Sequence, residues 1–416
     1  MRFDDRFRLL TWLSFGQICT MLVFANYQAL LPILQKEWAL TNGQAGWIYS
    51  SYHIGYILSV FILSSLTDYV NPKYIYLITA FWAGISGALF SLLAEGFRSA
   101  LILRTLMGIG LAGTYMPGLR MVSENFSPEQ RGRAVGIYVA SFTFGTSLSF
   151  FFTGFLNSAL SWRWAFLITS LGPIAAGVIA SLGMREISWS KAESGKDVSF
   201  AEILRNRPVM MMIGGYVCHM WEMFGMRGWM VAFLAACLLA MRYDLSKAVS
   251  MSTYITGWAT LIGALSNAIG GTLSDRFGRS NTIIIIMLGS GVLSLVIGWT
   301  ITFPLWIIVV VSLLYGLLIP AESSVISTGV TELAHPWGLG RTMAIQSVLG
   351  FGAASISPII FGYVLDLTNP ADALVRFGYF PNWGWAFTLL GLGGLIGPLF
   401  IWKMRREGAG YRSFLV

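Results

Sequence analysis

Long apolar stretches recur along the whole chain, separated by short polar segments. A helix of about 20 apolar residues crosses the roughly 30 Å hydrocarbon core of a bilayer, and each stretch reaches that length. The pattern therefore predicts an all-α polytopic membrane protein with twelve transmembrane helices. The predicted spans are 9–34, 45–67, 74–94, 99–122, 134–158, 163–183, 208–240, 248–273, 281–301, 304–331, 343–366 and 383–403.

Three short motifs occur twice, in the same order and at nearly the same separation, which indicates an internal repeat. The matched segments are 65–68 with 272–275, 124–133 with 332–341, and 162–166 with 383–387. We therefore expect two pseudo-symmetric six-helix bundles, one over 1–183 and one, with the tail, over 208–416. The segment 184–207 between them is predicted to be a cytoplasmic linker with a short helix that begins at the capping box Ser199-x-x-Glu202.

The net charge is +8, which by itself is compatible with nucleic-acid binding. However, most of the lysine and arginine residues fall in alternate loops and in the two termini. This is the positive-inside pattern, and it predicts an inner (cytoplasmic) membrane protein with both termini in the cytoplasm. It leaves no basic patch for nucleic acid. The charged N-terminus precedes an apolar run that is too long for a signal peptide, which predicts an uncleaved first span.

Other motifs do not indicate a cofactor or a metal. Cys19, Cys218 and Cys237 lie in apolar spans without paired spacing. The string Gly108-x-Gly110-x-x-Gly113 matches a dinucleotide-binding pattern, but it lies inside a predicted span and follows no strand. We interpret it as a helix-packing face.

The charged loop between the second and third spans of the second half is the most distinctive motif. Its residues Asp275-Arg276-Phe277-Gly278-Arg279 resemble the signature loop of the major facilitator superfamily, and the resemblance extends to span count, half-repeat and central loop over roughly 9–403. It implies a monomeric carrier that binds one substrate between two bundles and works by alternating access. In the first-half copy, Asp68 is kept but the glycine is replaced by Asn71, which can adopt left-handed geometry.

Charged residues at the predicted cytoplasmic ends of the helices are candidates for gating. Glu124 and Glu332 end the fourth and tenth spans, while Arg133 and Arg341 begin the fifth and eleventh. An arginine at a helix N-terminus opposes the helix macrodipole, so we expect these arginines to pair with the glutamates instead. The full predicted gating set is Asp68, Asp275, Arg276, Arg279, Glu124, Arg133, Glu332 and Arg341.

Ionisable residues at bilayer depth are costly and are functional candidates by default. The substrate-binding candidates are Arg104, Arg227, His53 and Arg120, and the proton-coupling candidates are Glu322 and Glu222. Arg120 is also close enough to Glu124 for an i,i+4 pair. Pro320 is expected to bend the tenth span beside Glu322. Glu222 and Arg227 lie five residues apart on one helix, roughly 140° around its axis, so we expect no pair between them.

These residues favour a secondary transporter of a small organic or inorganic anion, because arginine suits carboxylate and oxyanion recognition. Glutamates in a low-dielectric core can exchange protons as water access alternates, which favours proton coupling. The high aromatic and methionine content supports an alternative, an exporter of lipophilic or cationic compounds. A membrane-embedded sensor or enzyme is the alternative of another class. Against a sensor, the sequence shows no soluble output domain. Against an enzyme, it has no His-Glu-x-x-His motif, so we expect no enzyme activity.

Overall fold

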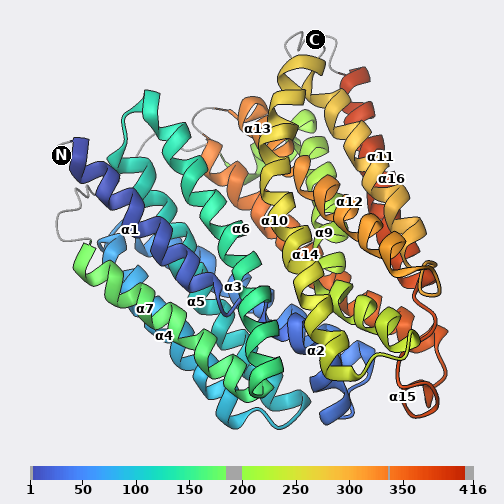
Figure 1. The fold of residues 1–416 in the computed structure, drawn as a ribbon. Helices are drawn as coiled ribbons and strands as arrows, with labels where there is room; N and C mark the ends of the chain where they lie inside the picture. The colour runs from blue at the N-terminus through green and yellow to red at the C-terminus, as the bar shows by residue number, and fades with distance from the viewer. Residues whose placement is uncertain (1–2, 184–198, 336–337, 408–416) are drawn as a thin grey trace. The chain divides into compact units, whose positions relative to one another are not determined.

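The computed structural model describes residues 3–183, 199–335 and 338–407, and within these ranges its elements of regular secondary structure are all helices (Figure 1). The helices are α1 (Phe3–Met21), α2 (Asn26–Glu37), α3 (Asn42–Leu66), α4 (Pro72–Leu93), α5 (Phe97–Asn125), α6 (Pro128–Ala159), α7 (Trp162–Gly183), α8 (Phe200–Arg205), α9 (Arg207–Ala240), α10 (Leu245–Phe277), α11 (Arg279–Ile297), α12 (Leu305–Ala321), α13 (Ser323–Leu333), α14 (Leu339–Thr368), α15 (Ala373–Arg376) and α16 (Gly384–Glu407).

Every predicted span coincides with a helix or with two consecutive helices, so the predicted all-α membrane fold is confirmed. Among the described residues, ten helical segments are long and apolar enough to cross a membrane. The helices α3 and α10, at the predicted spans 45–67 and 248–273, are not among these ten. Both are rich in serine, threonine, tyrosine and glycine, which lowers their mean hydropathy.

The chain divides into two compact units. Unit 1 comprises Met1–Leu40, Trp47–Glu193 and Asp244–Gly257, and unit 2 comprises Thr41–Gly46, Ser194–Tyr243 and Trp258–Val416. Within unit 1, α4 packs along α5 and α7; within unit 2, α16 packs along α9 and α11. Of the predicted linker, 184–198 lies outside the described residues, as do Pro336 of the repeated motif and the tail 408–416.

Two helices that the sequence predicts as single spans are interrupted. The predicted span 9–34 is split between α1 and α2, and the predicted span 304–331 is split between α12 and α13. Pro320 lies in the last turn of α12, which ends beside Glu322 at the position where the sequence predicts a bend. The capping box that begins α8 is also confirmed, because Ser199 and Glu202 each accept a hydrogen bond from the other's backbone N–H.

The glycine string in α5 is a packing face, as expected. A Cβ on Gly108 would collide with the backbone of Tyr52 in α3. A Cβ on Gly110 or Gly113 would collide with Ala83 or Thr79 in α4. Small residues at these positions let the helix backbones approach closely, and they position the neighbouring part of α5 against α3.

Candidate functional site

Arg104 is buried in the core of unit 1, where α5 places it against α2 and α3. Its side chain is 1% exposed. Its Nη1 atom donates to Asn26 Oδ1 at 3.2 Å and to the Val23 carbonyl at 3.5 Å. The guanidinium carbon lies 4.6 Å from the ring centroid of Tyr52 and 5.4 Å from that of Tyr27. Arg104 is therefore held by neutral groups and aromatic rings.

The break between α1 and α2 supplies the backbone carbonyl that Arg104 uses. The freed backbone groups beside it are satisfied by Ser149, which donates from Oγ to the Leu22 carbonyl at 2.6 Å and accepts from the Ala25 N–H at 3.1 Å. Because the helix is interrupted here, the Val23 carbonyl is turned out to the Arg104 guanidinium. Interrupted helices of this kind line substrate and ion sites in transporters.

No carboxylate within the described ranges pairs with Arg104, and its Nε atom has no hydrogen-bond partner among these residues. His53, a predicted substrate-binding residue, is in the same region. It is buried, with ring centroids 5.2 Å from Tyr49, 5.8 Å from Tyr52 and 6.1 Å from Phe24. Tyr52 therefore contacts both candidates, and the structure brings His53 and Arg104 into one aromatic cluster.

Unit 2 holds the predicted proton carriers. Glu322 lies at the break between α12 and α13 and is fully buried. Its Oε1 atom is 2.8 Å from Nδ1 of His219 in α9, which is also fully buried. The second oxygen of Glu322 and the second nitrogen of His219 have no partner among the described residues. The sequence did not predict this pair, since the two residues are far apart in the chain.

Glu222 lies one turn further along α9 from His219. Its Oε2 atom accepts a hydrogen bond from Ser290 Oγ in α11 at 3.1 Å. The prediction that Glu222 does not pair with Arg227 on the same helix stays a prediction. Arg227 is half-buried, and its guanidinium carbon lies 5.8 Å from the ring centroid of Phe224.

Arg120 of α5 joins two carboxylates at the end of unit 1 that we predict to be cytoplasmic. Its Nε atom donates to Glu124 Oε1 at 2.6 Å, which confirms the expected i,i+4 pair. Its Nη1 atom donates to Asp68 Oδ1 at 2.5 Å and to Thr67 Oγ1 at 2.6 Å. The structure therefore places Arg120 with the gating candidates, away from Arg104.

A similar network lies at the corresponding end of unit 2. Arg279 binds Glu332 through two hydrogen bonds, from Nε at 2.7 Å and from Nη2 at 2.5 Å. Its Nη1 atom is 3.9 Å from Asp275 Oδ1. Arg276 lies over the ring of Phe277, 5.4 Å from the ring centroid. Gly278 has a φ of 80°, a left-handed conformation that favours glycine and that separates α10 from α11.

One expectation about these loops is wrong. Asn71 does not take the left-handed geometry of Gly278, because its φ is −55° and its side chain caps α4 by accepting from the Lys73 N–H. In this structure Glu124 binds Arg120 and Glu332 binds Arg279, and the pairing of these glutamates with Arg133 and Arg341 stays a prediction. Arg133 is exposed, and Arg341 lies over Phe200.

Comparison with known families identifies the family of the chain. The family model for the "Major Facilitator Superfamily" matches residues 13–255, more than half of the sequence. The chain belongs to the major facilitator superfamily. It is therefore a multi-pass membrane protein and a secondary transporter, and the expectation that it is not an enzyme is confirmed because this superfamily comprises transporters.

Several members of the superfamily are similar over most of the chain. A hexuronate transporter of Bacillus subtilis is 22% identical over 88% of this chain and 89% of its own length. A probable sulfoacetate transporter of Cupriavidus necator is 22% identical over 86% of this chain and 88% of its own. The fold is that of a bacterial homologue of the human lysosomal transporter Spinster, with a TM-score of 0.76, 16% identity, and coverage of 100% of this chain and 98% of that one.

Proposed function

We propose that this transporter carries a small organic anion across the cytoplasmic membrane by alternating access, with both of its termini in the cytoplasm. We also propose that it couples this transport to protons. The observation that supports the anion is the environment of Arg104, a buried guanidinium with no carboxylate partner among the described residues. The proposed substrate-binding residues are Arg104 and His53 in unit 1 and Arg227 in unit 2.

The charge of Arg104 explains why an anion fits. Burial of an unpaired ion costs several kcal/mol, and cation–π contacts with Tyr27 and Tyr52 offset roughly 1–2 kcal/mol each at a desolvated site. A net positive charge therefore remains in the core of unit 1. A carboxylate or sulfonate would neutralise this charge. The guanidinium is planar and its Nε has no hydrogen-bond partner among the described residues, so it can donate hydrogen bonds to the oxygens of such a group.

The names of the two sequence relatives described above agree with this substrate class. Hexuronate and sulfoacetate are both small anions, one a sugar carboxylate and the other a carboxylate that also bears a sulfonate. This agreement supports an organic anion over the lipophilic or cationic compounds of the alternative hypothesis.

The pair of Glu322 and His219 supports proton coupling. A buried carboxyl group is costly to ionise unless a partner compensates its charge, so its proton occupancy depends on access to water and on its neighbours. His219 is the neighbour that can accept or return that proton over 2.8 Å. A carrier that alternately exposes such a pair to the two sides of the membrane would move one proton per cycle.

The test is uptake into proteoliposomes under an imposed pH gradient, with hexuronates and sulfoacetate as the first substrates. Arg104→Gln should abolish uptake of an anion that the wild-type protein transports. Arg163→Gln is the matched control, because Arg163 also contacts an aromatic ring and donates to a carbonyl, but at a helix end. Uptake that survives Arg104→Gln, or wild-type transport of lipophilic cations alone, would refute the proposed anion site.

A further inference from the structure

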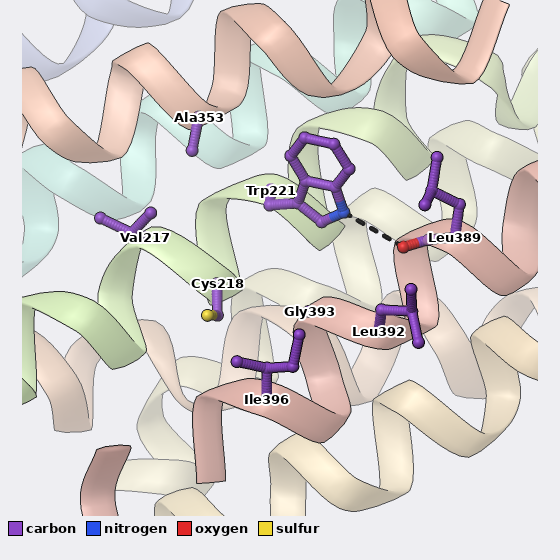
Figure 2. Close-up of a pocket in the computed structure, with 8 residues that line it drawn as sticks. All are labelled: Val217, Cys218, Trp221, Ala353, Leu389, Leu392, Gly393 and Ile396. Atoms are coloured by element: carbon purple, nitrogen blue, oxygen red, sulfur yellow. Dashed lines mark hydrogen bonds between the residues drawn. The ribbon is translucent and has the colours of Figure 1, made fainter. Parts of the chain in front are cut away.

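Unit 2 has an open apolar groove lined by α9, α14 and α16 (Figure 2). Its volume is about 280 Å³. Figure 2 shows the indole of Trp221 at one side, donating from Nε1 to the Leu389 carbonyl at 3.3 Å. The residues that line the groove are Val217, Cys218, Trp221, Ala353, Leu389, Leu392, Gly393 and Ile396.

A second cavity of about 310 Å³ lies along the same two helices, at the N-terminus of α9 and the C-terminal end of α16. Unlike the apolar groove, it contains two basic side chains, Arg207 and Lys403. Both are exposed, and Arg207 makes no ion pair with any described residue. Its remaining lining residues are Leu204, Met210, Met211 and Phe400.

The two cavities follow one another along the α9–α16 seam. Arg207 and Trp221 are 14 positions apart on α9, which corresponds to about 21 Å of helix. Between the cavities, the ring of Phe400 packs against Gly214, where a Cβ would contact it at 2.8 Å. The seam therefore has a positively charged end and an apolar part that extends through roughly one leaflet, since a leaflet's hydrocarbon is about 15 Å thick.

We infer that this seam binds an anionic phospholipid of the cytoplasmic leaflet. Its phosphate lies between Arg207 and Lys403, and an acyl chain lies in the apolar groove against Trp221. The inference rests on the proposed orientation of the chain, which puts the basic end at the cytoplasmic surface. Basic side chains at the end of a transmembrane helix attract anionic headgroups. A soluble substrate would leave the apolar part of the seam unused.

The helix α8 supports a position at the membrane surface. It is short, its N-terminus is closed by the Ser199 capping box, and its Ile203 is buried in unit 2. Phe200 and Leu204 are both more than half exposed, at 52% and 54%. Apolar side chains exposed at the start of a transmembrane helix are typical of a segment that lies in the lipid interface.

The experiment uses phospholipids with brominated acyl chains, which quench only tryptophans that they touch. The quenching of Trp221 alone is obtained as the difference between the quenching of the wild-type protein and that of Trp221→Phe. In nanodiscs with a minor fraction of brominated phosphatidylglycerol, we expect Trp221 to be quenched more strongly than with the same fraction of brominated phosphatidylcholine. The double variant Arg207→Gln/Lys403→Gln should weaken the anionic lipid's apparent affinity roughly 30-fold and remove this difference.

The matched control is Arg131→Gln/Arg133→Gln, which removes the same charge from the same predicted face at two exposed positions. This control should keep the wild-type preference for phosphatidylglycerol. Equal quenching by the two lipids in the wild-type protein would overturn the inference. A preference that survives Arg207→Gln/Lys403→Gln, or that is lost equally in the control, would also overturn it. Because quenching is measured without substrate, it fails or succeeds independently of the proposed anion transport.

Discussion

Each unit of this transporter buries one ionisable side chain beside an interrupted helix, but this side chain is basic in one unit and acidic in the other. In unit 1 it is Arg104, which contacts the break between α1 and α2. In unit 2 it is the carboxyl group of Glu322, which lies in the break between α12 and α13 and contacts His219. The two halves of the repeat have therefore diverged into a cationic site and an acidic site on a common framework.

The comparison shows what a helix break provides. An unbroken helix uses its backbone groups internally, so a buried side chain finds few polar partners there. At the first break a free carbonyl accepts from Arg104, whereas at the second the proline at 320 ends α12 and places Glu322 against another helix. We therefore propose a division of labour, with anion recognition in unit 1 and proton exchange in unit 2.

The loop networks show the opposite kind of divergence. Both units hold one arginine between two carboxylates, but the arginine comes from α5 in unit 1 and from the start of α11 in unit 2. In the internal repeat, the position equivalent to Arg120 is Thr328, and the position equivalent to Arg279 is Pro72. The network is thus kept while the helix that supplies its cation has changed, which supports a gating role for the network itself.

The largest effect is expected from Arg104→Gln. Removing one partner of a buried ion pair typically costs about 3–5 kcal/mol, and here the pair would be Arg104 and the bound anion. We therefore expect anion exchange in proteoliposomes to fall by about 100-fold or more. Arg104→Lys keeps the charge but loses the planar donor group, and it should retain part of the activity. Exchange at wild-type rates in Arg104→Gln would show that Arg104 does not bind the transported anion.

Glu322→Gln should separate proton coupling from substrate binding. The amide keeps the size of the side chain but cannot carry the proton, so accumulation driven by a pH gradient should be lost, by tenfold or more on the scale of general acid–base effects. Exchange of labelled for unlabelled substrate should persist. His219→Gln, which removes the partner, should show the same pattern. Accumulation that survives in both variants would show that this pair does not carry the proton.

Glu222→Gln is expected to have a smaller effect. The glutamine can still accept the hydrogen bond from Ser290, and Glu222 has no histidine partner within the described ranges. We expect gradient-driven accumulation to fall by only a few-fold, which is about 1 kcal/mol. Accumulation should be measured beside Glu322→Gln under the same pH gradient. A complete loss in Glu222→Gln with normal accumulation in Glu322→Gln would reverse the assignment.

Substitutions in the proposed gating network of unit 2 should slow turnover more where the residue makes closer contacts. Arg279→Gln removes two hydrogen bonds to a partly exposed Glu332, worth about 1 kcal/mol, and should slow turnover roughly fivefold. Asp275→Asn should slow it less, because that carboxylate is 3.9 Å from Arg279 and largely exposed. Arg406→Gln is the control, since Arg406 is outside the predicted gating set and lies over Trp402. Equal slowing in Arg406→Gln would indicate a general charge effect.

The fold was predictable because it follows from local patterns. The length of the apolar stretches predicted the helices. Pro320 indicated the position of one helix break, and the capping box indicated where α8 begins. The first break was not predicted, because the residues 22–25 contain no proline and the break depends on Ser149, which is distant in sequence. Asn26 was a usable signal, since an amide within an apolar span needs a polar partner.

The candidate site was predictable only residue by residue. Depth in the membrane identified Arg104, Glu222 and Glu322, but their partners come from other helices. His219 carried no sequence signal beyond its own depth, and its pairing with Glu322 depends on how α9 packs against the α12–α13 break. The sequence placed both Arg279 and Glu332 in the gating set, but it did not pair them, since helix-end chemistry cannot reveal which arginine reaches Glu332.

The division of labour is tested most directly by counting protons taken up as substrate binds to the purified protein. Calorimetric titration of a transported anion in buffers of different ionisation enthalpy gives both the affinity and the proton uptake. We predict that the wild-type protein takes up a proton, that Glu322→Gln binds the anion without proton uptake, and that Arg104→Gln does not bind it. Unchanged proton uptake in Glu322→Gln, or unchanged affinity in Arg104→Gln, would contradict the account.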